Sequence, residues 1–193
     1  MKAEPVRILF AALALASLTA CASSGASRTQ ASLVRPIDAA AVYSGVWYEV
    51  ARSVTPETTG CVAAEARFER DKKRRLTERD SCRMTADGGK ERVSAGQVKI
   101  LNRGLNTKFR TSYVYALNTD RREYWIVDHG DGWYIRTEPK RQTLSIFARN
   151  PNPDPSQLAM IMTRAKAFGD VALLEFPQPT GAGPALAAAD RQP

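Results

Sequence analysis

Residues 45–52 read Gly-Val-Trp-Tyr-Glu-Val-Ala-Arg, and this stretch decides the fold. Strand alternation places Trp47, Glu49 and Ala51 on one face and the residues between them on the other. Gly45 permits a backbone bend that other residues disfavour, and a large indole follows two residues later. A glycine bend followed by one aromatic plug suits the closed end of a small barrel, whereas an ordinary amphipathic strand is the alternative.

The composition suits one globular domain with a core, because 44% of the 193 residues are hydrophobic and 25% are charged.

The first 21 residues differ in composition from the rest of the chain. Lys2 and Arg7 precede an apolar run over residues 8–16, and Leu-Thr-Ala-Cys follows at residues 18–21. This order is typical of a secretory signal whose apolar run is too short to span a membrane.

The small residues before Cys21 resemble the lipobox of bacterial lipoproteins. The resemblance implies that residues 1–20 are a lipoprotein signal peptide, that Cys21 carries lipid such as palmitate, and that residues 21–36 form a flexible tether. Ala22 carries no signal for retention at the inner membrane, so the resemblance implies the periplasmic side of the outer membrane. A soluble secreted protein with an ordinary peptidase site is the alternative.

With Cys21 assigned to lipid, Cys61 and Cys82 remain as an even pair in an oxidising compartment, which favours a disulfide. This disulfide would close a loop of roughly 20 residues and contribute about 3 kcal/mol in the chain-entropy model. A metal site would need more ligands nearby, and the single histidine, His129, is distant in sequence. We therefore expect a structural disulfide, and no metal or cofactor.

Alternating hydrophobicity and turn residues predict seven strands after the first, at about residues 61–70, 75–83, 92–102, 107–117, 122–128, 133–138 and 143–149. Asp154 and Pro155 begin a helix that extends to about Phe168, and a last short strand covers residues 171–176. Strands in series without strand–helix alternation predict an all-β fold: an eight-stranded up-and-down antiparallel barrel with one C-terminal α-helix packed on the outside. The domain covers residues 37–178, and residues 179–193 are expected to be disordered.

Three segments in this order resemble the signatures of the lipocalin family, specifically the bacterial outer-membrane lipocalins related to apolipoprotein D. They are residues 45–52, residues 124–128 with the following hairpin, and residues 144–151. The resemblance covers about residues 43–178 and implies that Arg149 closes over Trp47 at the shut end of the barrel. A cation–π contact of this kind contributes on the order of 1 kcal/mol, so Gly45, Trp47 and Arg149 are interpreted as structural. A cysteine pair like Cys61 and Cys82 and a lipobox also recur in this group.

An eight-stranded barrel can enclose one small ligand. The small side chains on the inner face of residues 61–70 leave space for it, and Glu49 is interpreted as hydrogen-bonded within the barrel rather than titrating. The inward faces of the predicted strands would line the cavity with Ala64, Ala66, Phe68, Val98, Ile100, Phe109, Tyr113, Tyr115, Trp133 and Ile135.

This largely apolar wall indicates non-catalytic binding, storage or transport of a fatty acid, lysophospholipid or phospholipid at the outer membrane. Two alternatives stay open. One is a structural envelope lipoprotein whose barrel is filled by its own side chains. The other is a lipocalin-fold enzyme, which would need a nucleophile or an acid–base pair that the sequence does not provide, since His129 has no evident Ser or carboxylate partner.

The net charge of +8 is densest at residues 72–75, Lys-Lys-Arg-Arg. A nucleic-acid partner is not expected, because no recognition helix or interleaving of aromatic and basic residues supports one. A solvated hairpin tip explains the run, and contact with anionic lipid head groups is the alternative. The sequence sets no oligomeric state.

Overall fold

The computed structural model describes residues 35–84, 89–115 and 118–177. The predicted signal peptide, Cys21 and most of the predicted tether lie outside these residues, as does the predicted tail. The strands are β1 Gly45–Ser53, β2 Ala63–Arg70, β3 Leu76–Arg83, β4 Glu91–Ile100, β5 Lys108–Val114, β6 Thr119–Gly130, β7 Trp133–Glu138, β8 Thr143–Ala148 and β9 Leu174–Glu175. The helices are α2 Ala39–Val42 and α3 Pro155–Ala165, and a 3-10 turn, η1, covers Val171–Leu173.

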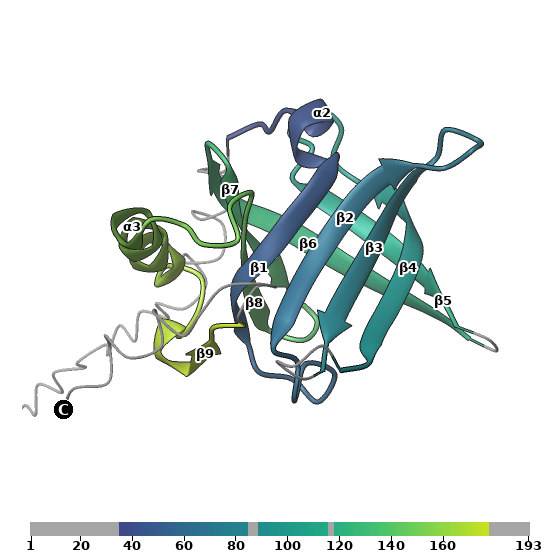
Figure 1. Cartoon of the computed structure of the whole chain (residues 1–193). Helices are drawn as coiled ribbons and strands as arrows, with labels where there is room; N and C mark the ends of the chain where they lie inside the picture. Colours follow the sequence, from purple (N-terminus) through teal and green to yellow (C-terminus); the bar gives the residue numbers. More distant parts are fainter. Residues whose placement is uncertain (1–34, 85–88, 116–117, 178–193) are drawn as a thin grey trace, which may run out of the picture. The chain divides into compact units, whose positions relative to one another are not determined.

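The first eight strands form a closed antiparallel barrel, which confirms the predicted fold (Figure 1). Each strand pairs with the next, and β1 closes the ring by pairing with both β2 and β8. The short strand β9 adds to the end of β1 through the pairs Arg52↔Glu175 and Ser53↔Leu174. The predicted last strand at residues 171–176 is therefore η1 followed by only two strand residues. The described residues contain no helix that is both long and apolar enough to cross a membrane.

Gly45, Trp47 and Arg149 shut one end of the barrel, here called the closed end. Gly45 has φ +63°, a value that favours glycine, so the predicted bend is present. The Arg149 guanidinium lies 3.7 Å from the centre of the Trp47 ring and donates hydrogen bonds to the carbonyls of Val46 (2.7 Å) and Ala41 (2.6 Å). Arg149 thereby fastens α2 to β1, and desolvation lowers the pKa of its guanidinium.

Two separate apolar clusters stabilise the fold. The first fills the closed half of the barrel interior, mainly with aromatic side chains: Tyr43, Trp47, Phe68, Phe109, Tyr124, Tyr134 and Phe147. The second lies between the outside of the barrel and α3, where the helix buries Leu158, Ile161 and Ala165. The predicted helix start is confirmed, because Asp154 accepts a hydrogen bond from the Ser156 backbone N–H and Pro155 follows it. The helix ends at Ala165, earlier than predicted.

Two β-bulges change which residues point inward. In β1 the pairing with β8 shifts between Glu49 and Ala51, so that Ala51 joins the outer cluster and Arg52 points into the barrel opposite Ser145. The prediction that Ala51 shares a face with Trp47 is therefore wrong. In β6 the pairing with β7 shifts between Ile126 and Asp128. Each bulge places one extra residue on its strand and so reverses the alternation beyond it.

Candidate ligand cavity

A cavity of about 480 Å³ occupies the open half of the barrel, opposite the closed end. Its inner wall comes from the open-end halves of the strands, and its mouth comes from the segment after β1 and the turn between β7 and β8. The lining includes the following residues: Glu49, Arg52, Glu57, Cys61, Ala64, Asp80, Cys82, Arg92, Val93, Tyr113, Tyr115, Arg122, Tyr124, Arg136, Glu138, Arg141, Ser145 and Phe147. The barrel is thus filled at one end and hollow at the other.

Of the ten residues predicted to line the cavity, Ala64, Tyr113 and Tyr115 do so, and Tyr115 lies at the rim with 41% of its surface exposed. Five others point into the barrel but belong to the filled closed half: Ala66, Phe68, Val98, Ile100 and Phe109. They were assigned to the cavity because alternation identifies the face of a strand but not the depth along it. Ligand contact by Ala64, Tyr113 and Tyr115 stays a prediction.

Trp133 and Ile135 lie on the outer wall, and their assignment to the cavity is wrong. Both belong to the cluster beneath α3, whereas Tyr134 and Arg136 point inward from the same strand. The error has a physical cause. The helix covers the outside of β7, so its outer face is as apolar as an inner face, and hydrophobicity no longer distinguishes the two sides.

A network of polar side chains lies in the barrel between the cavity and the aromatic filling. Glu78 is fully buried and accepts hydrogen bonds from Arg136 (2.8 Å) and Thr111 (2.5 Å). The Tyr113 hydroxyl donates to Asp80 (2.5 Å), and it lies 3.1 Å from the Tyr124 hydroxyl. A buried polar group is costly unless it is hydrogen-bonded, and this network satisfies Glu78 fully.

The ionisable side chains in this network have pKa values shifted from their usual ranges. Burial, and then the nearby charge of Glu78, raise the pKa of Asp80 to about 8. Burial also raises the pKa of Tyr113 well above its usual range. For Arg136 burial would lower the pKa, but the surrounding acidic groups, Glu78 foremost, together raise it well above its usual range, so the guanidinium stays charged. The Arg136 guanidinium is also covered by the rings of Tyr124 (4.2 Å) and Phe147 (4.5 Å).

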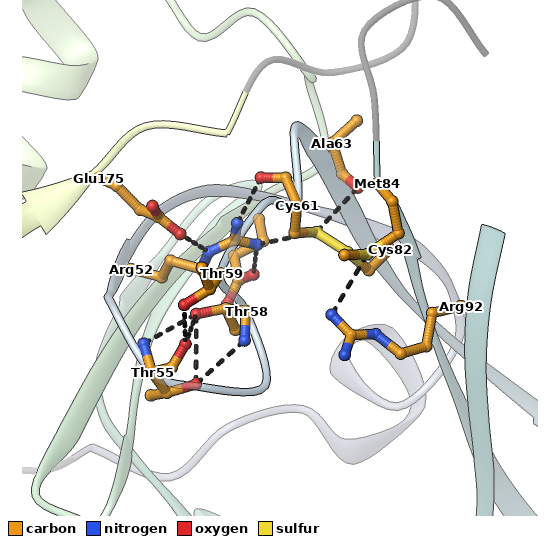
Figure 2. The surroundings of a disulfide bond; sticks show 11 residues. Arg52, Thr55, Thr58, Thr59, Cys61, Ala63, Cys82, Met84, Arg92 and Glu175 are labelled. Carbon is orange, nitrogen blue, oxygen red and sulfur yellow. Dashed lines mark hydrogen bonds and ion pairs between the residues drawn. A yellow bond between two sulfur atoms is a disulfide. The ribbon is translucent and has the colours of Figure 1, made fainter. Parts of the chain in front are cut away.

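Arg52 lies beside the disulfide, as Figure 2 shows, and is also part of the cavity lining. Its guanidinium is 1% exposed and donates hydrogen bonds to Glu49 (2.9 Å), Glu175 (2.6 Å) and the Cys61 carbonyl (2.7 Å). The predicted Cys61–Cys82 disulfide is confirmed and joins the segment before β2 to the end of β3. Glu49 accepts a hydrogen bond from Arg52 within the barrel, as predicted from the sequence.

Most of the charged lining was not predicted, although one signal was available. Ala64 and Ala66 pair with Cys82 and Asp80, and Phe68 pairs with Glu78. Because directly paired residues lie on the same face of a sheet, the inward face of β2 together with the predicted disulfide indicates that Asp80 and Glu78 also point inward. No such signal exists for Arg52, whose direction depends on the bulge in β1. In the part of the chain that the structure describes, no group of His, Cys, Asp and Glu side chains could hold a metal ion.

A family profile described as a lipocalin-like domain matches residues 37–179. No curated protein sequence matches the chain. Among solved structures, the tryptamine complex of the amine-binding protein of Rhodnius prolixus is similar with a TM-score of 0.59 at 10% identity, covering 75% of this chain and 82% of that chain. Insecticyanin from the tobacco hornworm Manduca sexta has a TM-score of 0.55 at 14% identity, with coverages of 75% and 82%. Lobster apocrustacyanin A1 has a TM-score of 0.54 at 14% identity, with coverages of 84% and 89%. At such identities these likenesses indicate the fold alone. Because the family profile extends over nearly the whole described domain, the chain belongs to the lipocalin family.

Proposed function

We propose that this lipocalin binds, stores or transports a small hydrophobic ligand and catalyses no reaction. The observation that carries the proposal is the cavity of about 480 Å³, which lies within the range of small-molecule sites, roughly 300–1,000 Å³. Aromatic and small apolar side chains line much of it, among them Ala64, Val93, Tyr113 and Phe147. The ligand classes expected from the sequence are a fatty acid, a lysophospholipid or a phospholipid.

The proposal includes a location at the periplasmic side of a bacterial outer membrane, with lipid on Cys21. Its support is the lipobox-like sequence before Cys21. The described chain begins at the closed end, where the Ile37 N–H donates to the Leu105 carbonyl. The exposed basic residues Lys72, Lys73 and Arg74 lie at this same end, in the turn between β2 and β3.

The two alternatives have less support. The side-chain-filled barrel fits only the closed half, because a cavity of about 480 Å³ remains beyond the aromatic cluster, whose Tyr124 and Phe147 form part of the cavity wall. An enzyme would need a reactive group in the cavity, but Cys61 and Cys82 form a disulfide. His129 is at the closed end, where its Nε2 lies 3.1 Å from the Arg35 carbonyl oxygen.

Native mass spectrometry with lipid extraction tests the proposal on the full chain carrying Cys21→Ser. We expect one co-purified or added ligand per chain. In Ala64→Trp the indole would occupy the cavity, and ligand uptake should be lost. Ala95→Trp is the matched control, because Ala95 is exposed on the outward face of β4. An empty protein that takes up no fatty acid or lysophospholipid would favour the filled barrel instead.

A further inference from the structure

Asp80 is the carboxylate in the cavity whose charge is not matched. Its hydrogen-bond donor is the Tyr113 hydroxyl, and no ion-pair partner occurs for it among the residues that the structure describes. Part of its surface stays open, and it lines the cavity. The carboxylate oxygen that does not accept from Tyr113 is therefore available to a ligand.

None of the interior arginines forms an ion pair with Asp80 among the residues that the structure describes, because each pairs with another carboxylate. The charge of Arg136 lowers the pKa of Asp80 but does not offset the effects of burial and Glu78. Arg136 pairs with Glu78 at 2.8 Å, and Arg52 with Glu49 at 2.9 Å. Arg122 pairs with Asp120 at 2.7 Å, and Arg141 pairs with both Glu57 and Glu138. Arg92 is exposed at the mouth, where it donates to the Met84 sulfur.

The groups around Asp80 come from five strands and leave a net negative charge. Glu78 shares its strand, and the other neighbours are Glu49 and Arg52 on β1, Tyr113 on β5, Arg122 and Tyr124 on β6, and Arg136 and Glu138 on β7. With Glu78 and Arg136 paired, an ionised Asp80 adds one uncompensated charge in a site where charges are poorly solvated.

We propose that the cavity binds an amphiphilic primary amine. Its ammonium group donates a hydrogen bond to the Asp80 carboxylate, and its apolar body lies against the aromatic wall. This inference rests on the proposed function and names the chemistry of its ligand. An ammonium group donates three hydrogen bonds and brings the positive charge that Asp80 lacks. The rings of Tyr113, Tyr124 and Phe147 and the methyl group of Ala64 provide the apolar surface.

A carboxylate head group fits the site less well. It would add a second negative charge beside Glu78, and the cation that could bind it, Arg136, is already paired with Glu78 and packed against the rings of Tyr124 and Phe147. In the empty cavity a proton takes the place of the cation, which agrees with the raised pKa of Asp80. An ammonium group displaces this proton, so amine binding should strengthen as the pH rises from 6 to 8.

Isothermal titration of the full chain carrying Cys21→Ser with n-decylamine, 1-decanol and decanoic acid tests the inference, because the three tails are matched. We expect decylamine to bind about tenfold more tightly than decanol at pH 8, as one charge-assisted hydrogen bond implies. The advantage should shrink at pH 6, and proton release should appear as a dependence of the heat on buffer ionisation. Asp80→Asn keeps the shape and should abolish the preference. Glu123→Gln is the control, since Glu123 pairs with Arg110 outside the barrel.

The outcomes separate the two proposals. If decanol or decanoate binds as tightly as decylamine, or Asp80→Asn keeps the preference, the amine inference is wrong while the binding function stands. If none of the three ligands binds, the binding function fails and the inference fails with it. The pH dependence of the unmodified cavity provides a readout that does not depend on how well the variant folds.

Discussion

Arg149 makes three contacts that no other side chain could make together. Its planar guanidinium stacks on Trp47, and two of its nitrogens donate to the carbonyls of Val46 and Ala41. Lysine offers a compact ammonium without the flat face or the forked donors. The contact therefore depends on the shape of the arginine head group as well as on its charge.

We predict that Arg149→Ala lowers the free energy of unfolding by about 2–4 kcal/mol, because it removes the cation–π contact and two hydrogen bonds that the charged guanidinium donates. Arg149→Lys should recover less than half of this loss. Urea unfolding followed by tryptophan fluorescence measures both values. A loss below about 1 kcal/mol for Arg149→Ala would contradict the role assigned to the closed end.

At the scale of single residues, the predicted contacts of the closed end and the disulfide are correct. The inward direction of residues that depends on strand register was missed. The contact of Arg149 with Trp47 was predicted correctly through the resemblance to the lipocalin signatures, and the disulfide because two cysteines remain once Cys21 is assigned to lipid. Arg52 could not be placed, because one extra residue in β1 turns it inward. Asp80 was missed because charged residues are ordinarily expected on the solvent side, although its pairing with Ala66 on the inward face of β2 indicates its position.

The helix α3 contributes through one buried stripe, and its other side faces solvent. Ile161 is completely buried between the helix and the barrel, whereas Met160, its neighbour in sequence, is 41% exposed. The two residues thus provide a matched comparison within one helical turn.

We expect Ile161→Ala to lower the free energy of unfolding by about 3 kcal/mol, through lost apolar burial and the cavity that remains. Met160→Ala should change it by less than about 0.5 kcal/mol. Thermal and denaturant unfolding compare the two variants directly. Equal losses would indicate that the helix contributes through its backbone or its caps rather than through this stripe.

The elements themselves were predicted well, and their faces less well. All eight barrel strands and the helix were located within a few residues, because turn residues and alternation mark where strands stop. For strand β7 the predicted bounds are correct but the predicted faces are inverted, because burial on both sides removes the contrast in hydrophobicity between them.

For the whole molecule, the carboxyl group of Asp80 in the cavity makes stability depend on pH. Asp80 has its pKa raised to about 8 in the folded chain, above the value of 3.8 that it starts from. Between these values the folded chain holds a proton that the unfolded chain has released. Stability therefore falls as the pH rises from about 4 to about 8 and levels off above that range.

The Asp80→Asn variant should lose this dependence. We expect the wild type to be about 1–3 kcal/mol less stable at pH 8 than at pH 5 relative to the variant, with water in the cavity reducing the effect. Thermal unfolding at both pH values measures the difference, and the comparison with the variant removes the contribution of other titrating groups. Parallel curves for the two proteins would mean that Asp80 is solvated like a surface carboxylate.

The first described residues contact the barrel at the closed end, beside Leu105 and His129, whereas the cavity mouth lies at the opposite end. A sensor surface, bead or fluorophore attached through residues that precede residue 35 would therefore be joined to the protein at the closed end. Small molecules in the surrounding solution would keep free passage across the rim. Immobilisation through that side should thus preserve uptake, whereas attachment at the turn between β7 and β8 would obstruct it.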